Sequence, residues 1–97
     1  MSGVKVKLAG WLRRFSKDGV VEVKVSDEGV TVRELIKRLV DILGPDFGSQ
    51  ILDEELHDPR ARVLILVDGV EVSALSGLDT RLNRGSEVVL VPFFHGG

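Results

Sequence analysis

The sequence predicts an α+β fold in which one main helix packs on one face of a mixed β-sheet, in the order ββαββ. Three observations predict it: alternating apolar residues near the N-terminus, one apolar stripe of helical period in the middle, and short β-type stretches after it. The 97 residues, of which 43% are hydrophobic, suffice for one compact core. We therefore expect a single domain over residues 1–91.

The first two strands are predicted from side chains that alternate between apolar and charged. Val4, Val6 and Leu8 alternate with lysines in residues 4–8, and valines alternate with Glu22 and Lys24 in residues 21–25. A period of two is typical of a strand with one buried and one solvated face. The two strands are expected to pair through a long hairpin loop.

The helix is predicted to start with a capping box. Thr31 stands at the N-cap position and Glu34 follows three residues later, at the spacing that lets each side chain bind the other residue's backbone N–H. Apolar residues then recur at helical spacing up to Leu43. Gly44 and Pro45 are expected to end the helix.

Residues 46–62 form the least patterned stretch. Within it, Asp53 to Asp58 bring together several carboxylates and His57, and these groups can ligate metal ions. A solvated acidic loop is the stronger interpretation of this segment.

The C-terminal part is predicted to return to the sheet. Residues 63–67 form a strand, Asp68-Gly69 supplies a two-residue hairpin turn, and residues 70–72 return. After an irregular stretch with a helical turn, residues 88–91 form the last strand, which Pro92 ends. This strand must lie beside the first one to complete the core.

Two of these strands are apolar on both faces. If Ile65, Val67, Val88 and Leu90 point at the helix, the residues between them lie on the face that no helix covers. An exposed apolar patch of this kind suggests a protein-binding surface. The predicted partner-binding residues are Leu64, Leu66, Val89 and Val91.

Composition excludes several classes of function. The chain has no cysteine, which removes disulfides, thiolate catalysis and thiolate metal sites. A net charge of −2, with both signs interspersed, gives no footprint for nucleic acid or an anionic membrane. No apolar run is long enough for a signal peptide or a membrane span. A cytoplasmic protein with a protein partner is the expectation.

The sequence ends in Pro92-Phe93-Phe94-His95-Gly96-Gly97. Two successive glycines carry no Cβ and can thread where any side chain would collide. Fully extended, residues 92–97 reach roughly 20 Å. We expect a flexible tail over residues 92–97 that can enter the active site of a partner.

Several short motifs resemble the ubiquitin-like β-grasp sulfur carriers. The resemblance covers Val67 to Glu71, Leu78 to Leu82, Gly85 to Val88 and the terminal Gly96-Gly97. The similar proteins are the small subunit of molybdopterin synthase, especially its archaeal forms, and the ubiquitin-related modifier of tRNA thiolation. Pro92 resembles the proline near the C-terminal tail of the molybdopterin synthase subunit. The ending His95-Gly96-Gly97 resembles the ending of the ubiquitin-related modifier.

The resemblance implies a chemistry that the protein undergoes rather than catalyses, with no cofactor of its own. A ubiquitin-activating-type enzyme would adenylate the Gly97 carboxylate, and sulfur would then replace AMP to leave a thiocarboxylate. The implied later partners are the large subunit of molybdopterin synthase or a tRNA-thiolation enzyme. Covalent linkage of Gly97 to lysines of other proteins is a second implied outcome. The alternative is a non-covalent β-grasp binding module with an incidental Gly-Gly end.

Overall fold

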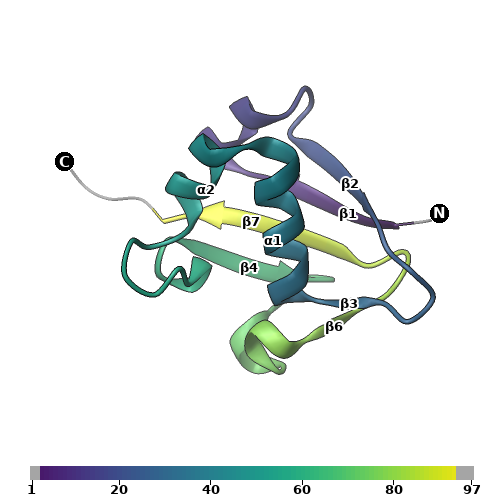
Figure 1. Cartoon of the computed structure of the whole chain (residues 1–97). Coiled ribbons are helices and arrows are strands. Elements are labelled where there is room, and N and C mark those ends of the chain that lie inside the picture. Colours follow the sequence, from purple (N-terminus) through teal and green to yellow (C-terminus); the bar gives the residue numbers. More distant parts are fainter. Residues whose placement is uncertain (1–2, 94–97) are drawn as a thin grey trace.

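The computed structural model describes residues 3–93, which form a five-stranded mixed sheet with helices on one face (Figure 1). The strand order is β2-β1-β7-β4-β5, and a separate two-stranded sheet joins β3 to β6. The strands are β1 Gly3–Leu8, β2 Val20–Lys24, β3 Val30–Thr31, β4 Val63–Val67, β5 Val70–Glu71, β6 Arg81–Leu82 and β7 Glu87–Pro92. The helices are α1 Val32–Leu43 and α2 Pro45–Ile51, with short 3-10 turns η1 Gly10–Phe15, η2 Pro59–Ala61, η3 Val72–Ala74 and η4 Gly77–Asp79.

The first and last strands lie side by side at the centre of the sheet. β1 pairs with β7 in parallel, with Val6 opposite Val88, while β1–β2, β4–β7 and β4–β5 are antiparallel. This confirms the predicted α+β class and the position of the last strand. Because alternate residues of β1, β4 and β7 point at the helices, the core lies between the sheet and α1.

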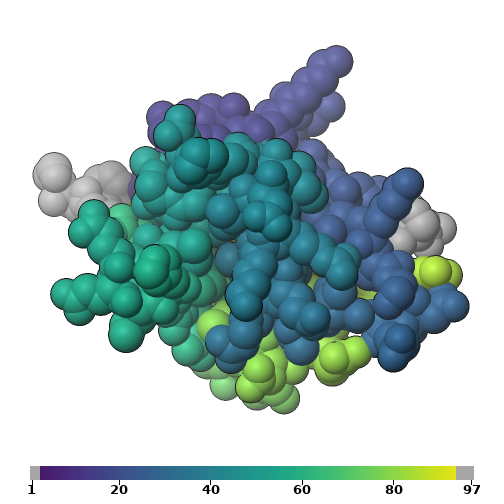
Figure 2. Space-filling model, in the orientation of Figure 1, coloured from purple at the N-terminus to yellow at the C-terminus, as the bar shows by residue number. Residues whose placement is uncertain are grey.

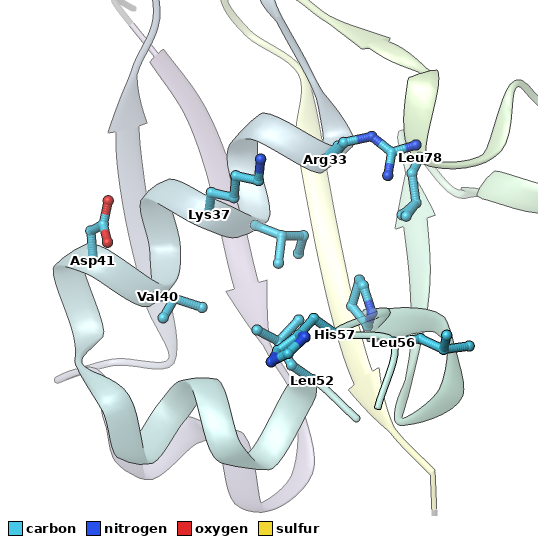
Figure 3. Close-up of a pocket in the computed structure, with 10 residues that line it drawn as sticks. Arg33, Lys37, Val40, Asp41, Leu52, Leu56, His57 and Leu78 are labelled. Atoms are coloured by element: carbon cyan, nitrogen blue, oxygen red, sulfur yellow. The ribbon is translucent and has the colours of Figure 1, made fainter. Parts of the chain in front are cut away.

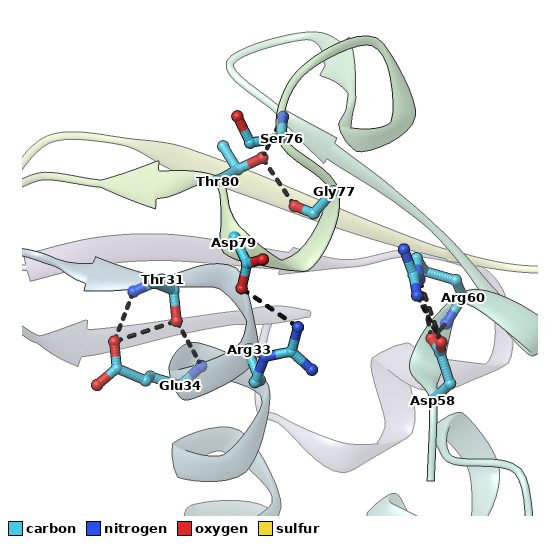
Figure 4. A network of polar contacts seen from close by, with 9 residues as sticks. All are labelled: Thr31, Arg33, Glu34, Asp58, Arg60, Ser76, Gly77, Asp79 and Thr80. Carbon is cyan, nitrogen blue, oxygen red and sulfur yellow. Dashed lines mark hydrogen bonds and ion pairs between the residues drawn. The ribbon is translucent and has the colours of Figure 1, made fainter. Parts of the chain in front are cut away.

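The capping box of α1 is present as predicted (Figure 4). The Glu34 backbone N–H donates to Thr31 Oγ1 at 3.1 Å, and the Thr31 N–H donates to Glu34 Oε1 at 2.9 Å. The hydrogen bond from the Thr31 backbone, helped by its hydroxyl, lowers the pKa of Glu34. A cap of this kind stabilises a helix by about 1 kcal/mol.

The expectation of an unpatterned loop from residue 46 was wrong. Gly44 and Pro45 do end α1, but α2 begins at Pro45 itself. Proline is tolerated at the first position of a helix, where its missing N–H would have no partner. Phe47 and Ile51, one turn apart, are fully buried, and a Cβ on Gly48 would lie 3.0 Å from Val40 of α1. Close packing of the two helices therefore extends the core into the stretch whose sequence is the least patterned.

Three short elements, η1, β3 and β6, were also missed. The loop between β1 and β2 contains η1, whose Leu12 is fully buried. β3 and β6 pair through Val30 opposite Leu82, and the Val32 N–H donates to the Thr80 carbonyl at 3.0 Å. This ladder ties the start of α1 to the segment before β7.

Candidate partner-binding surface and C-terminal tail

The four predicted surface residues lie together on the face of the sheet opposite α1. Leu64 stands opposite Val91 and Leu66 opposite Val89 in the β4–β7 ladder. Each is partly exposed, while the residues that alternate with them are buried. The predicted alternation is confirmed. We call these four residues the apolar patch.

Charged residues border the apolar patch. Lys7 forms an ion pair with Glu87 at 3.4 Å, and Glu71 lies directly opposite Leu66. In the same sheet, Lys5 stands opposite Glu22. Because the Lys7 and Glu87 side chains are 49% and 41% exposed, their ion pair contributes little to stability. An apolar centre with a polar rim is the usual composition of a protein-binding surface.

Two exposed apolar residues near the patch were not among those predicted for it. Val20 is opposite Lys7 in the β1–β2 ladder, and Lys7 is in turn opposite Val89. Val20 is 41% exposed and Phe93, just past β7, is 40% exposed. The sequence could have predicted the position of Val20. It directly precedes the inward-facing Val21, so the alternation of β2 places Val20 on the open face of the sheet.

β7 leads directly from the patch to the tail. Pro92 is the last residue of β7, and the Phe93 N–H donates to the Arg62 carbonyl at 3.0 Å. Beside them, Gly10 has φ 57°, and a Cβ there would lie 3.0 Å from the Pro92 ring. η1 therefore packs against the start of the tail. The other predicted tail residues, Phe94, His95, Gly96 and Gly97, lie outside the described residues.

The acidic segment forms an ordered turn. The Asp53 carboxylate accepts hydrogen bonds from the backbone N–H groups of Leu56 at 3.0 Å and Asp58 at 2.8 Å. These bonds, first the one from Leu56, lower the pKa of Asp53. The Arg60 side chain likewise lowers the pKa of Asp58, which it binds at 2.7 Å (Figure 4). Within residues 3–93, no three His, Asp or Glu side chains converge as a metal site would require.

Across the same described part of the chain, no helix is long and apolar enough to cross a membrane.

A mixed sheet with a parallel central pair, crossed on one face by its longest helix, defines the ubiquitin-like β-grasp class. A family model described as the ThiS family matches residues 6–97. The chain belongs to the ThiS family, within the ubiquitin-like sulfur carriers and modifiers.

The relatives agree with this assignment. A protein of Archaeoglobus fulgidus, provisionally described as a sulfur carrier, is 32% identical over 76 residues, which are 78% of this chain and 84% of that protein. The structure of small archaeal modifier protein 1 from Methanosarcina acetivorans has a TM-score of 0.81 and 26% identity, covering 100% of this chain and 98% of its own. A Pyrococcus furiosus protein, provisionally named molybdopterin converting factor subunit 1, has a TM-score of 0.73 and 28% identity, covering 97% and 100%. The expected family and fold are confirmed.

Proposed function

We propose that this protein is a sulfur carrier whose Gly97 carboxylate is adenylated by a ubiquitin-activating-type enzyme and then converted to a thiocarboxylate. The observation that carries the proposal is the course of β7. This strand contributes Val89 and Val91 to the apolar patch and continues into the tail, in a family match that runs to Gly97. An enzyme that binds the patch would therefore hold the tail in a fixed direction.

Activation is needed because a carboxylate is a poor electrophile. In the proposed sequence, a Gly97 oxygen attacks the α-phosphate of ATP and releases pyrophosphate. Sulfide supplied by a partner then attacks the acyl carbon of the adenylate, and AMP leaves. The phosphate-binding groups, the metal and the sulfur donor would belong to the partners, so this protein is proposed to be a substrate rather than an enzyme.

The proposed partners follow from the same chemistry. The activating enzyme comes first, and the large subunit of molybdopterin synthase or a tRNA-thiolation enzyme would then take the sulfur. The likeness to the Pyrococcus furiosus protein supports the large subunit of molybdopterin synthase as a partner. A protein named as subunit 1 of a molybdopterin converting factor works with at least one other subunit. These partners imply a cytoplasmic location.

Conjugation of Gly97 to lysines of other proteins is a second candidate function. The likeness to the Methanosarcina acetivorans modifier favours it. Both functions begin with the same adenylate, and they differ only in whether sulfur or an amine attacks it. A non-covalent binding module, with an incidental Gly-Gly end, is the alternative that shares no step with them.

The proposal is tested by intact-mass measurement. Incubation with the cognate activating enzyme, ATP and a sulfur donor is expected to increase the mass by the exchange of one oxygen for sulfur, located at Gly97. Omission of ATP provides the control. An unchanged mass in the complete mixture would support the binding module instead.

The patch has its own prediction. Leu66→Lys is expected to weaken binding to the activating enzyme by about tenfold or more, because it places a charge at the centre of an apolar contact. Lysine suits this position better than glutamate, since residue 66 lies opposite Glu71 and like charges across strands repel. Calorimetric titration measures the affinity, and thermal unfolding should show a nearly unchanged Tm.

Ile42→Lys is the matched control. Ile42 is 57% exposed and lies on α1, on the other side of the sheet. This variant should bind like the unsubstituted protein. If the two lysine variants bound with equal affinity, the apolar patch would not be part of the interface with the activating enzyme.

A further inference from the structure

The end of β7 is held from two sides. On one side, the Ala9 N–H donates to the Leu90 carbonyl at 3.0 Å, which brings the start of η1 across the end of β7. On the other side, the Phe93 N–H donates to the Arg62 carbonyl at 3.0 Å, just before β4 begins. Pro92 therefore lies between two ordered backbone segments at the start of the tail.

Proline suits this position because β1 has already ended beside it. Successive residues of a strand direct their backbone groups to opposite edges, and the Leu90 carbonyl points to the β1 edge while the Phe93 N–H points to the β4 edge. The nitrogen of Pro92 therefore faces the β1 edge, but β1 stops at Leu8. Gly10 of η1 lies there instead, so the proline ring meets η1 rather than a strand.

Gly10 allows η1 to approach the Pro92 ring closely. Its φ of 57° lies in the left-handed region, and a Cβ there would lie 3.0 Å from Pro92 Cγ and 3.5 Å from Pro92 Cδ. Contacts this close are rare for real side chains, so the ring would have to move by a few tenths of an ångström. Because the ring also fixes the φ of residue 92, such a shift would be passed on to Phe93.

The Arg62 carbonyl on the other side belongs to an ordered turn. The Arg62 N–H donates to the Pro59 carbonyl at 3.0 Å, and Pro59 is buried. Earlier in this segment, the Asp53 carboxylate binds the backbone N–H of Leu56 at 3.0 Å. Figure 2 shows the segment projecting beside α1, and Figure 3 shows Leu56 at the groove between them. These contacts hold in place the carbonyl that binds Phe93.

We propose that Gly10 is a positioning residue for adenylation, because with Pro92 and Arg62 it forms a tail clamp that directs residues 94–97 into the activating enzyme. The inference rests on the proposed sulfur-carrier function. Four residues follow the clamp and, fully extended, reach about 14 Å. A short chain that leaves a fixed point samples a small volume, and this raises the effective concentration of the Gly97 carboxylate beside ATP.

The tail clamp and the apolar patch are expected to affect different kinetic constants. The patch supplies affinity for the activating enzyme, so its loss should raise the KM for this protein. The clamp sets the alignment of the reacting carboxylate after binding. Its loss should therefore lower kcat and leave KM nearly unchanged.

ATP–pyrophosphate exchange with the cognate activating enzyme, at varied concentrations of this protein, tests the clamp. Gly10→Ala is expected to lower kcat about tenfold, because the shifted ring misaligns the tail. Gly77→Ala is the matched control. Gly77 begins η4 as Gly10 begins η1, its φ is 58°, and a Cβ there would meet only the end of the Arg60 side chain, at 3.3 Å. Both variants should lose the same few degrees in Tm, since the cost to the backbone is the same.

Pro92→Ala separates the contact from the backbone effect, because it removes the Cγ and Cδ atoms that a side chain at residue 10 would meet. In that background Gly10→Ala should lower kcat by less than about twofold, as a double-mutant cycle of two contacting residues requires. Hydrogen exchange of the Phe93 amide needs no enzyme. We expect it to be about tenfold faster in Gly10→Ala and unchanged in Gly77→Ala.

Three results would overturn the tail clamp. They are equal kcat values for Gly10→Ala and Gly77→Ala, the same loss with and without the Pro92 ring, and a higher KM at unchanged kcat, which would place Gly10 in the binding surface. Failure of the proposed function looks different, because the unsubstituted protein would then give no pyrophosphate exchange at all. With no reaction to position, the role of Gly10 would be rejected together with it.

Discussion

Deletion of Gly97 is expected to abolish adenylation, and with it thiocarboxylate or isopeptide formation, without loss of folding stability. Truncation withdraws the reacting carboxylate by about one residue, roughly 3.5 Å, from a site that must align it with ATP. Misplacement on this scale costs orders of magnitude in rate. The free energy of unfolding should change by no more than about 0.5 kcal/mol, because His95, Gly96 and Gly97 carry no large apolar side chain.

Two measurements are needed for this variant. ATP–pyrophosphate exchange with the cognate activating enzyme reports adenylation, and thermal unfolding reports stability. His95→Ala is the matched control, since it keeps the length of the tail, both glycines and the position of the carboxylate. Exchange at the full rate by the truncated protein would reject the sulfur-carrier proposal and retain the binding module.

Phe47→Ala is expected to cost about 3 to 5 kcal/mol of folding stability, the range for truncating a buried aromatic side chain. Phe47 is fully buried, and its ring meets the Phe15 ring edge-on, with centroids 5.4 Å apart and planes at 77°. Small domains unfold with about 5 to 15 kcal/mol in total, so the loss would be a large fraction. The expected fall in Tm is about 12 °C or more.

Chemical denaturation with thermal unfolding measures this effect. Gln50→Ala is the matched control, because Gln50 is exposed on the same short helix. It should change the stability by no more than about 0.5 kcal/mol. If the two variants were equally stable, α2 would not be part of the core.

Local patterns of the sequence predicted most of the sheet and the start of α1. Alternation in β1 and β7 indicated which residues face the helix, and the same parity placed the apolar patch on the open face. Thr31 and Glu34 predicted the capping box because both partners lie within one helical turn. The motifs near Gly69 and Gly96-Gly97 indicated the family that the comparisons confirm.

The sequence by itself therefore determined the fold class and the apolar patch, because a period of two or of 3.6 records which side of an element is buried. The family was indicated by the resemblance of short motifs and not by periodicity. Only the tertiary structure decided that residues 45–51 form a helix, since α2 depends on Gly48 meeting Val40 and Phe47 meeting Phe15. It also decided that Leu56 projects beside a groove. That arrangement requires α1 and the turn after α2 to pack together, and no periodicity within either segment records a contact between them.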